Sequence, residues 1–158
     1  MKLLKLLSPV IAACIFIGTS NGAIAAGCKG GYIEGQELDS LNLDGKTCFV
    51  VNTIIDGDVK VKNSEGFFLI DSVVRGDVKV TQGDETYISR NTIGKDLTVD
   101  RMDHAIVILN IVDGNTGILG NDKADVKGNV FLINLFCDNN RRLDELKNTV
   151  NGAKDCVR

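Results

Sequence analysis

The stretch Gly57-Asp58-Val59-Lys60-Val61 decides the fold, because it recurs along the chain at a fixed distance. It returns as Gly76-Asp77-Val78-Lys79-Val80, then as Lys95-Asp96-Leu97-Thr98-Val99, and more weakly as Gly114-Asn115-Thr116-Gly117-Ile118. Each step is 19 residues. A fixed period near twenty residues is typical of a solenoid, in which each repeat forms one coil and stacks on the next.

Two further apolar blocks keep the same step and show which kind of solenoid this is. They are Cys48–Val51, Phe67–Ile70, Thr86–Ser89 and Ala105–Ile108, and then Ile54–Ile55, Val73–Val74, Thr92–Ile93 and Ile111–Val112. The blocks are short and rich in Val and Ile, and Val59 and Val61 alternate with polar residues as in a strand. We therefore expect an all-β, single-domain parallel β-helix (a β-solenoid) with coils of about 19 residues, three short strands each, about 4.8 Å apart.

The regular pattern weakens after Asn115. Gly128-Asn129-Val130 follows Gly114 after only 14 residues, which predicts a shortened coil within Ile118–Lys127 and another coil through Val130–Ile133. Leu143 and Leu146 stand at helical spacing after Asp138 and Asn139, two possible N-caps, so residues 138–147 are expected to form a short helix or an irregular loop. Asn148–Gly152 then resembles the start of a coil at Asn91–Lys95.

The N-terminus reads as an export signal. Lys2 and Lys5 precede an apolar run that ends in the small-residue pattern Ala23-Ile24-Ala25. The predicted organisation is a signal peptide over 1–25, an N-terminal cap over 26–47, β-helix coils over 48–136 and a C-terminal cap over 137–158. The mature chain would keep 16 basic and 21 acidic residues, a net charge of −5, which argues against nucleic acid as a partner. It has no second long apolar run, so no transmembrane segment is expected.

Four cysteines remain after the signal: Cys28, Cys48, Cys137 and Cys156. An even number in an exported chain predicts two disulfides, and the spacings favour Cys28 with Cys48 and Cys137 with Cys156. Each would close one end of the domain and stabilise it by roughly 3 kcal/mol. A lipid anchor at Cys28 is an alternative, since Ala25-Ala26-Gly27-Cys28 faintly resembles a bacterial lipobox. No CxxC pair occurs and His104 is the only histidine, so no zinc site or other cofactor is expected.

Two columns of the repeat are candidates for binding. Asp58, Asp77, Asp96 and Asn115 share one column, which could hold a calcium ion; we favour carboxylates that bond local backbone N–H groups. Phe49, Phe68, Tyr87 and Ile106 share another, for which we favour core packing over stacking on sugar rings.

His104, Arg141 and Arg142 are three further residues with side chains that could carry chemistry. His104 follows Asp103 without a nucleophile motif, and we expect it on a turn between coils. We expect Arg141-Arg142 in a solvated loop; the alternative is that the pair binds a carboxylate or sulfate.

The ending of the chain resembles that of small secreted bacterial β-helix proteins of uncharacterised role. They carry Gly-Asn repeats and finish with a Cys-x-x-Asn element and a closing cysteine, as in Cys137-Asp138-Asn139-Asn140 and Cys156. The Gly-Asp-Val-x-Val units also resemble the bactofilins, polymer-forming bacterial β-helix proteins of the cytoplasm. The export signal and the end-closing cysteines depart from the bactofilin pattern. The resemblance implies a β-helix fold and an extracytoplasmic place for this chain.

These features together favour an exported, periplasmic or extracellular, non-enzymatic protein that presents a rigid scaffold for structural or surface interactions. The partner would be an envelope or matrix polymer, or a second copy. A self-assembling envelope or matrix protein is one alternative. The other is a small polysaccharide-active enzyme, for which Asp77, Asp96 and Arg75 on neighbouring coils are the candidate residues.

Overall fold

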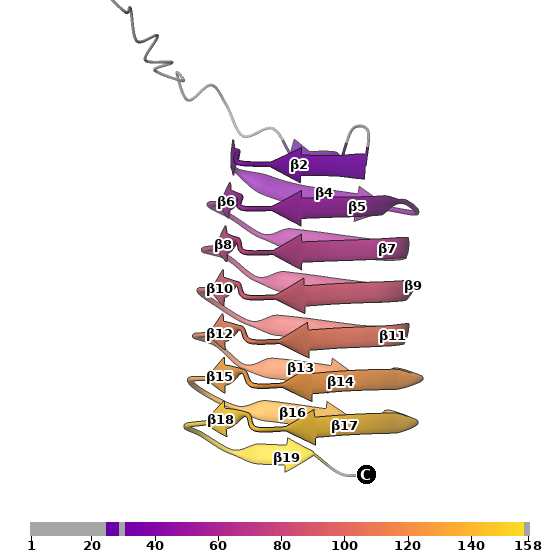
Figure 1. The fold of residues 1–158 in the computed structure, drawn as a ribbon, viewed down its shortest axis with the longest axis vertical. Helices are drawn as coiled ribbons and strands as arrows, with labels where there is room; N and C mark the ends of the chain where they lie inside the picture. The colour runs from indigo at the N-terminus through magenta and orange to yellow at the C-terminus, as the bar shows by residue number, and fades with distance from the viewer. Residues whose placement is uncertain (1–24, 29–30, 157–158) are drawn as a thin grey trace, which may run out of the picture.

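A computed structural model describes residues 25–28 and 31–156 as one column of stacked β-coils, which confirms the predicted parallel β-solenoid (Figure 1). Every strand pairing among these residues is parallel. The predicted signal peptide and its cleavage pattern fall almost wholly outside the described residues.

Each coil is a triangle with three sides. The long strands β7, β9 and β11 bend from the first side to the second; other coils use separate strands for each side. The first side holds β1 (Ala25–Ala26), β4 (Ser40–Asp44), the first part of β7 (Val59–Ile70), of β9 (Val78–Ser89) and of β11 (Leu97–Ile108), then β13 (Thr116–Leu119), β16 (Leu135–Asp138) and β19 (Lys154–Cys156). The second side holds β2 (Tyr32–Glu34), β5 (Thr47–Val51), the second part of β7, β9 and β11, then β14 (Lys123–Lys127) and β17 (Arg142–Leu146). The third side holds β3 (Glu37–Leu38), β6 (Ile54–Ile55), β8 (Val73–Val74), β10 (Thr92–Ile93), β12 (Ile111–Val112), β15 (Val130–Phe131) and β18 (Thr149–Val150).

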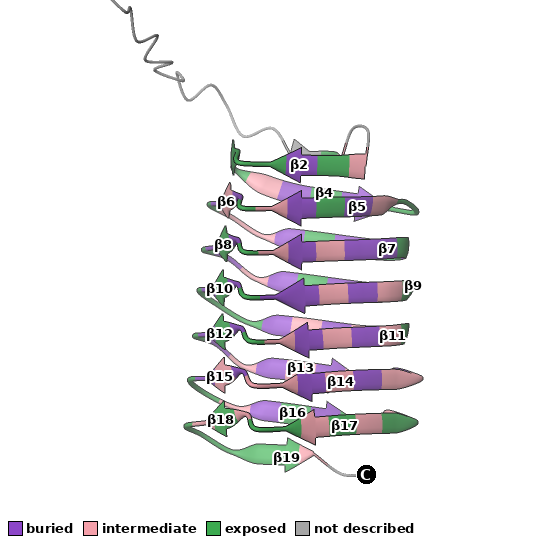
Figure 2. Ribbon diagram, in the orientation of Figure 1, coloured by how far each residue is buried: buried purple, intermediate pink, exposed green. Residues whose placement is uncertain are grey.

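The core runs down the axis as columns of equivalent side chains, because alternate residues of each strand face inward (Figure 2). Val59, Val78 and Leu97 form one fully buried column on the first side. Leu69, Ile88 and Val107 form another on the second side, and Ile55, Val74, Ile93, Val112 and Phe131 line the third. Parallel in-register stacking therefore buries each aliphatic side chain between two others like it.

Two of the three corners have a left-handed backbone in coil after coil. One corner holds, in successive coils, Asn63, Gln82, Arg101, Gly120 and Asn139. The four non-glycine residues among them have φ between 51° and 58°. Asn52, Asp71, Arg90, Leu109, Gly128 and Lys147 share the other. A non-glycine residue in this conformation costs roughly 1–2 kcal/mol. The stack keeps it because the chain must turn at the same place in each coil to stay in register.

Polar side chains, all buried except the partly buried last one, form a ladder along the inside of the second corner, called here the asparagine ladder. Its rungs are Thr53, Ser72, Asn91, Asn110, Asn129 and Asn148. In the middle of the ladder, Asn110 Oδ1 accepts from the backbone N–H and from Nδ2 of Asn91, both at 3.0 Å. Its own Nδ2 donates to Ile88 O at 2.8 Å and to Asn129 Oδ1 at 3.0 Å. A shorter ladder of Asn121 and Asn140 lines the first corner. These amides satisfy the backbone donors that a tight corner leaves without strand partners.

The expected break after Asn115 is wrong, because the 19-residue step continues to the end. Thr116 pairs with Leu135, Lys123 pairs with His104, and Val130 pairs with Ile111. Gly128-Asn129-Val130 is therefore equivalent to Leu109-Asn110-Ile111 and not to Gly114-Asn115-Thr116. The irregular steps lie instead at the other end of the stack. Leu41 pairs with Val59 and Tyr32 with Phe49, steps that are one and two residues shorter, and Ala25 pairs with Ser40 after only 15 residues.

The expected helix or loop over 138–147 is also wrong. Residues Arg142–Leu146 form β17, which pairs in register with β14. A helix here would have left the edge of β14 without hydrogen-bond partners. The coil start expected at Asn148–Gly152 is confirmed, since Thr149 and Val150 form β18 on the third side.

Both disulfides join the predicted cysteines, Cys28 with Cys48 and Cys137 with Cys156. Cys137 and Cys156 are direct register partners in the inward column that continues from Ile118. Cys48 likewise occupies the inward column of Phe67. Each disulfide thus ties a terminal coil to its neighbour from within the core. Within the segments expected to be caps, 26–47 and 137–158, the described residues contribute strands to the two ends of the stack.

Candidate interaction surface

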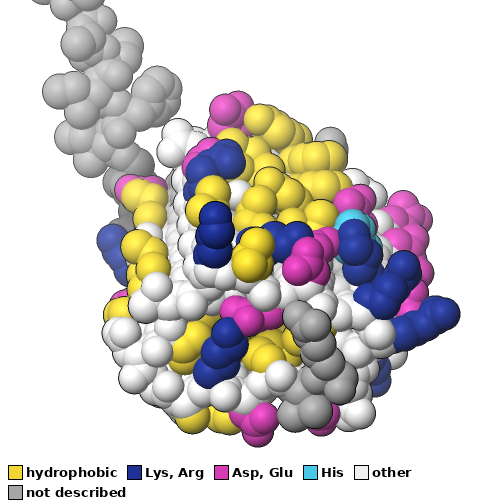
Figure 3. Space-filling view, turned by 60° about the horizontal axis from the view of Figure 1, so that its bottom comes forward, with side chains coloured by type: hydrophobic (Ala, Val, Ile, Leu, Met, Phe, Trp, Pro, Cys, Tyr) yellow, Lys and Arg dark blue, Asp and Glu magenta, His cyan; other side chains and the backbone are white. Residues whose placement is uncertain are grey.

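The second side of the solenoid carries a row of apolar side chains that point to solvent. They come from outward positions of β2, β5, β7, β9 and β11, one above the other, and we call this row the aromatic strip. Its members are Tyr32, Phe49, Phe68, Tyr87 and Ile106. Tyr32 is 52% exposed and Phe49 38% exposed. Figure 3 shows hydrophobic side chains gathered on one side of the molecule, next to a group of basic and acidic ones.

The expectation that this aromatic column packs in the core is wrong. The inward residues on either side of Phe68 are Phe67 and Leu69, both fully buried, so alternation turns Phe68 outward. The same column continues through Asp125 and Asp144 once the 19-residue step is kept. Two carboxylates at its end mark it as an outer column, and the supposed break after Asn115 hid them.

The rings of Phe49 and Phe68 lie face to face, with centroids 4.3 Å apart and planes 6° from parallel. One face of each ring therefore packs against the other ring. A second column, Val51, Ile70, Ser89 and Ile108, flanks the strip on the same strands. It is apolar except for Ser89, which is buried. The two columns form a surface suited to lateral contact, because the residues that shape it are fixed on a continuous sheet.

The strip ends abruptly in a charged cluster on β14. Asp125 accepts hydrogen bonds from Lys123 Nζ at 2.9 Å and Lys127 Nζ at 3.1 Å, and lies 3.2 Å from Nε2 of His104. Burial alone would raise the pKa of Asp125, but the bonds from Lys123, His104 and Lys127 outweigh it and lower the pKa to about 2. The cluster is therefore a neutralised, fixed network that borders the apolar area.

His104 was expected on a turn between coils, but it lies within strand β11. Its ring faces Asp125 on the adjacent strand β14, two residues beyond its register partner Lys123. It does not face the neighbouring Asp103, because adjacent residues of a strand point to opposite sides. Asp103 is exposed. The two residues do not form a catalytic pair.

The column of Asp58, Asp77 and Asp96 bonds backbone, as favoured from the sequence. Asp58 Oδ1 accepts from the N–H of Asp77 at 3.1 Å, and Asp77 Oδ1 accepts from the N–H of Asp96 at 3.1 Å. Asp96 Oδ1 accepts from the N–H of Asn115 at 2.7 Å. The bond from Asp77, then the pairing with Lys60 at 3.0 Å, lowers the pKa of Asp58. One oxygen of each carboxylate is thus committed to joining successive coils.

The residues considered for polysaccharide chemistry are each engaged in such cross-coil bonds. Arg75 pairs with Asp56 on the preceding coil, while Asp77 and Asp96 hold the backbone of the following one. Asp77 and Asp96 thus bond successive coils, and the Arg75 guanidinium is paired with Asp56.

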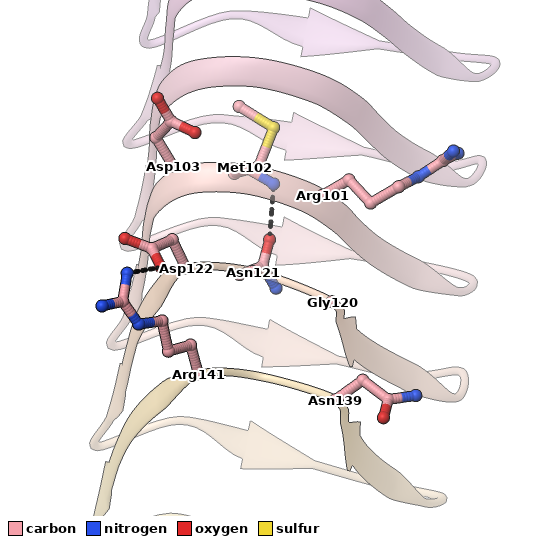
Figure 4. A pocket seen from close by; sticks show the side chains of 8 residues that line it. All are labelled: Arg101, Met102, Asp103, Gly120, Asn121, Asp122, Asn139 and Arg141. Carbon is pink, nitrogen blue, oxygen red and sulfur yellow. Dashed lines mark hydrogen bonds and ion pairs between the residues drawn. The ribbon is translucent and has the colours of Figure 1, made fainter.

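A hollow of about 310 Å³ lies at the corner between β13 and β14, where Gly120 interrupts a column of longer side chains. Figure 4 shows its two rim arginines pointing in opposite directions. Arg101 pairs with Asp100 at 3.0 Å and Arg141 with Asp122 at 2.9 Å. Arg142 lies in β17, not in a loop, and reaches Asp122 at 3.5 Å. The arginines are thus bound to carboxylates and do not converge on one point in the hollow.

Within residues 25–28 and 31–156, no group of three His, Cys, Asp or Glu side chains is placed to hold a metal ion. The same part of the chain contains no helix of the length and hydrophobicity needed to cross a membrane.

The strip is visible in the sequence as a repeated column, but it lies on the outer side of the sheet and not on the expected inner side. The asparagine ladder was not expected from the sequence. The ladder could have been found, since Asn91, Asn110, Asn129 and Asn148 recur at the coil period. Comparison with known proteins adds no relative: no family model matches the chain, and no curated protein or solved structure matches it significantly.

Proposed function

We propose that this chain is an exported, non-enzymatic scaffold protein that presents the aromatic strip of its second side to a partner in the cell envelope or extracellular matrix. The observation that carries the proposal is the strip itself. Five apolar residues occupy consecutive outward positions on one sheet, whereas soluble proteins rarely keep large contiguous apolar patches without a binding role.

The fold supports this use because it is rigid in the direction of the strip. The strands beneath are tied by continuous parallel ladders and by buried amide bonds between successive coils. A partner would meet the strip without the entropic cost of ordering a loop. The two disulfides fit an oxidising compartment outside the cytoplasm.

The test is co-sedimentation of the oxidised protein with the insoluble envelope and matrix fraction of the cells that make it. The variant Phe49→Thr/Phe68→Thr removes the stacked rings and keeps residues that suit strands. The matched control is Val73→Thr/Ile111→Thr on the third side, where Val73 is 40% and Ile111 45% exposed and Thr92 already stands between them.

We expect binding by the wild type and the control, and a loss of about tenfold or more in the ring variant, in line with the removal of two anchoring aromatics. Equal binding by all three proteins would overturn the role of the strip. Release of soluble sugars from the fraction by the wild type would instead support the enzyme alternative.

A further inference from the structure

The last coil differs from the others at two positions of the inward columns. Glu145 is the register partner of Val126, in the column of Leu69, Ile88 and Val107. Lys154 is the register partner of Leu135, in the column of Val59, Val78 and Leu97. Earlier coils place aliphatic residues or a threonine at these two positions. The final coil therefore turns two opposite charges toward the axis of the solenoid.

These two charges meet across the end of the coil. Nζ of Lys154, on the first side, lies 2.6 Å from Oε2 of Glu145, on the second side. The Glu145 side chain is only 16% exposed. The ion pair spans the mouth of the core beside Leu143 and Val150, which are partly buried against it.

The other oxygen of Glu145 ends the asparagine ladder. In the middle of the ladder, each Nδ2 donates once to a carbonyl and once to the next asparagine, as Asn110 does to Ile88 O and Asn129 Oδ1. Asn148 donates to Val126 O at 2.7 Å, but it is the last asparagine of the ladder. Its second donation goes to Oε1 of Glu145 at 2.6 Å. Glu145 thus supplies from within the last coil the acceptor that a further coil would supply.

We propose that Glu145, Lys154 and Asn148 form a built C-terminal stop that prevents another chain from stacking end-on against the last coil. Strands β17, β18 and β19 each have a partner on one edge only among the described residues, so backbone pairing alone would invite such stacking. An added coil would bury both charges, and its own acceptor would compete with Glu145 Oε1 for the N–H of Asn148 Nδ2. Burying an ion pair carries a desolvation cost that aliphatic stacking does not.

The stop would limit how copies can assemble. Open filaments need head-to-tail contact between the two different ends of a solenoid. With the C-terminal end closed, head-to-tail growth is blocked. Two copies could then associate only as a closed dimer through their N-terminal ends, or through lateral contacts between their sides. This goes beyond the proposed lateral binding and is independent of it.

The test replaces the stop by the residues of earlier coils. Glu145→Leu/Lys154→Leu restores apolar columns at positions where Leu69 and Leu135 are already accepted. The matched control, Lys147→Leu/Asp155→Leu, removes the same charges from exposed positions of the same coil; their columns already hold Leu109 and Phe136. Mass is measured by light scattering and sedimentation over a range of concentrations, on oxidised protein whose fold is checked by circular dichroism.

We expect the Glu145→Leu/Lys154→Leu protein to gain at least about twofold in mass as concentration rises, with rods of unchanged width in electron micrographs. The wild type and the control should show no such gain. An unchanged mass of the folded variant, or end-on rods already formed by the wild type, would overturn the proposal.

A second measurement covers the case in which that variant does not fold. In the wild type, the side-chain NH₂ of Asn148 should exchange slowly with water, as that of Asn110 does. In Glu145→Ala its exchange should speed up at least about tenfold while Asn110 stays protected. Equal exchange at Asn148 in both proteins would show that Glu145 does not end the ladder, and would overturn the proposal.

Discussion

Replacement of Asn110 by alanine should be among the most destabilising single changes in this protein, although it removes a polar side chain. Asn110 is almost fully buried in the middle of the asparagine ladder. Its side chain takes part in four hydrogen bonds, two as acceptor and two as donor. Alanine can make none of them.

The magnitude follows from the groups that lose their partners. The backbone N–H of Asn91 loses its acceptor, Asn110 Oδ1, inside the protein. Asn91 Nδ2 keeps Leu69 O, and Asn129 Oδ1 keeps the backbone N–H of Asn110, so these two groups stay partly satisfied. A buried donor without a partner costs about 1–3 kcal/mol, and the small cavity adds to it, so we expect a loss of about 3–4 kcal/mol in the free energy of unfolding.

The assay is equilibrium unfolding in urea at neutral pH, followed by far-ultraviolet circular dichroism, with both disulfides intact. Asn42→Ala is the control, because Asn42 is exposed on β4 and its loss should change the free energy by less than about 0.5 kcal/mol. If Asn110→Ala came within about 1 kcal/mol of that control, the ladder would not contribute to stability in the way its geometry indicates.

Three further changes test other parts of the stack. Gly83→Ala would place Cβ 2.2 Å from Ser64 O, and we expect it to lower the free energy of unfolding by about 1–3 kcal/mol. The control Gly117→Ala places Cβ at an ordinary 3.5 Å from Leu119 Cδ1 and should be near neutral. Equal melting temperatures of the two variants would contradict this expectation. Cys137→Ser/Cys156→Ser should cost about 3 kcal/mol and raise amide exchange in β19 before that in β9, while unchanged exchange in β19 would count against a local role. Because the folded pKa of Asp125 lies near 2, below its unfolded value, its contribution to stability is present above about pH 4 and is lost as pH falls toward 2. Asp125→Asn should therefore flatten the dependence of the urea midpoint on pH between about 4 and 2, and identical profiles for the two proteins would refute the assignment.

The fold could be predicted from the sequence because its cause is repeated in the sequence. The step from Val59 to Val78 to Leu97 places like residues on top of one another, and parallel pairing rewards that arrangement in each coil. The disulfides followed too, since each spans about one coil.

The position of the aromatic strip could not be predicted because the phase of the repeat was lost after Asn115. The glycine of the Gly-Asp-Val unit served as its marker, yet that corner also holds Lys95 and Ile133. Only the alternation of buried aliphatics shows the true phase, and with it that Phe68 faces outward.

The C-terminal stop was invisible for a different reason. Glu145 and Lys154 come from different sides of the coil, and their meeting depends on the register of β17 and β19. Sequence spacing alone predicts neither register when the segment is taken for a helix or loop.

The 19-residue step, which is regular from Cys48 onward, also makes the molecule modular in units of one coil. Removal of residues 76–94 would join Arg75 to Lys95 and leave every column in place, with a rod shorter by about 4.8 Å. Loss of a single residue from β9 would instead move the inward side chains of the rest of that strand to the outer face and the outward ones to the core, since neighbouring positions face opposite ways. The length of such a protein can therefore change in evolution by duplication or deletion of complete repeats, while its cross-section stays fixed.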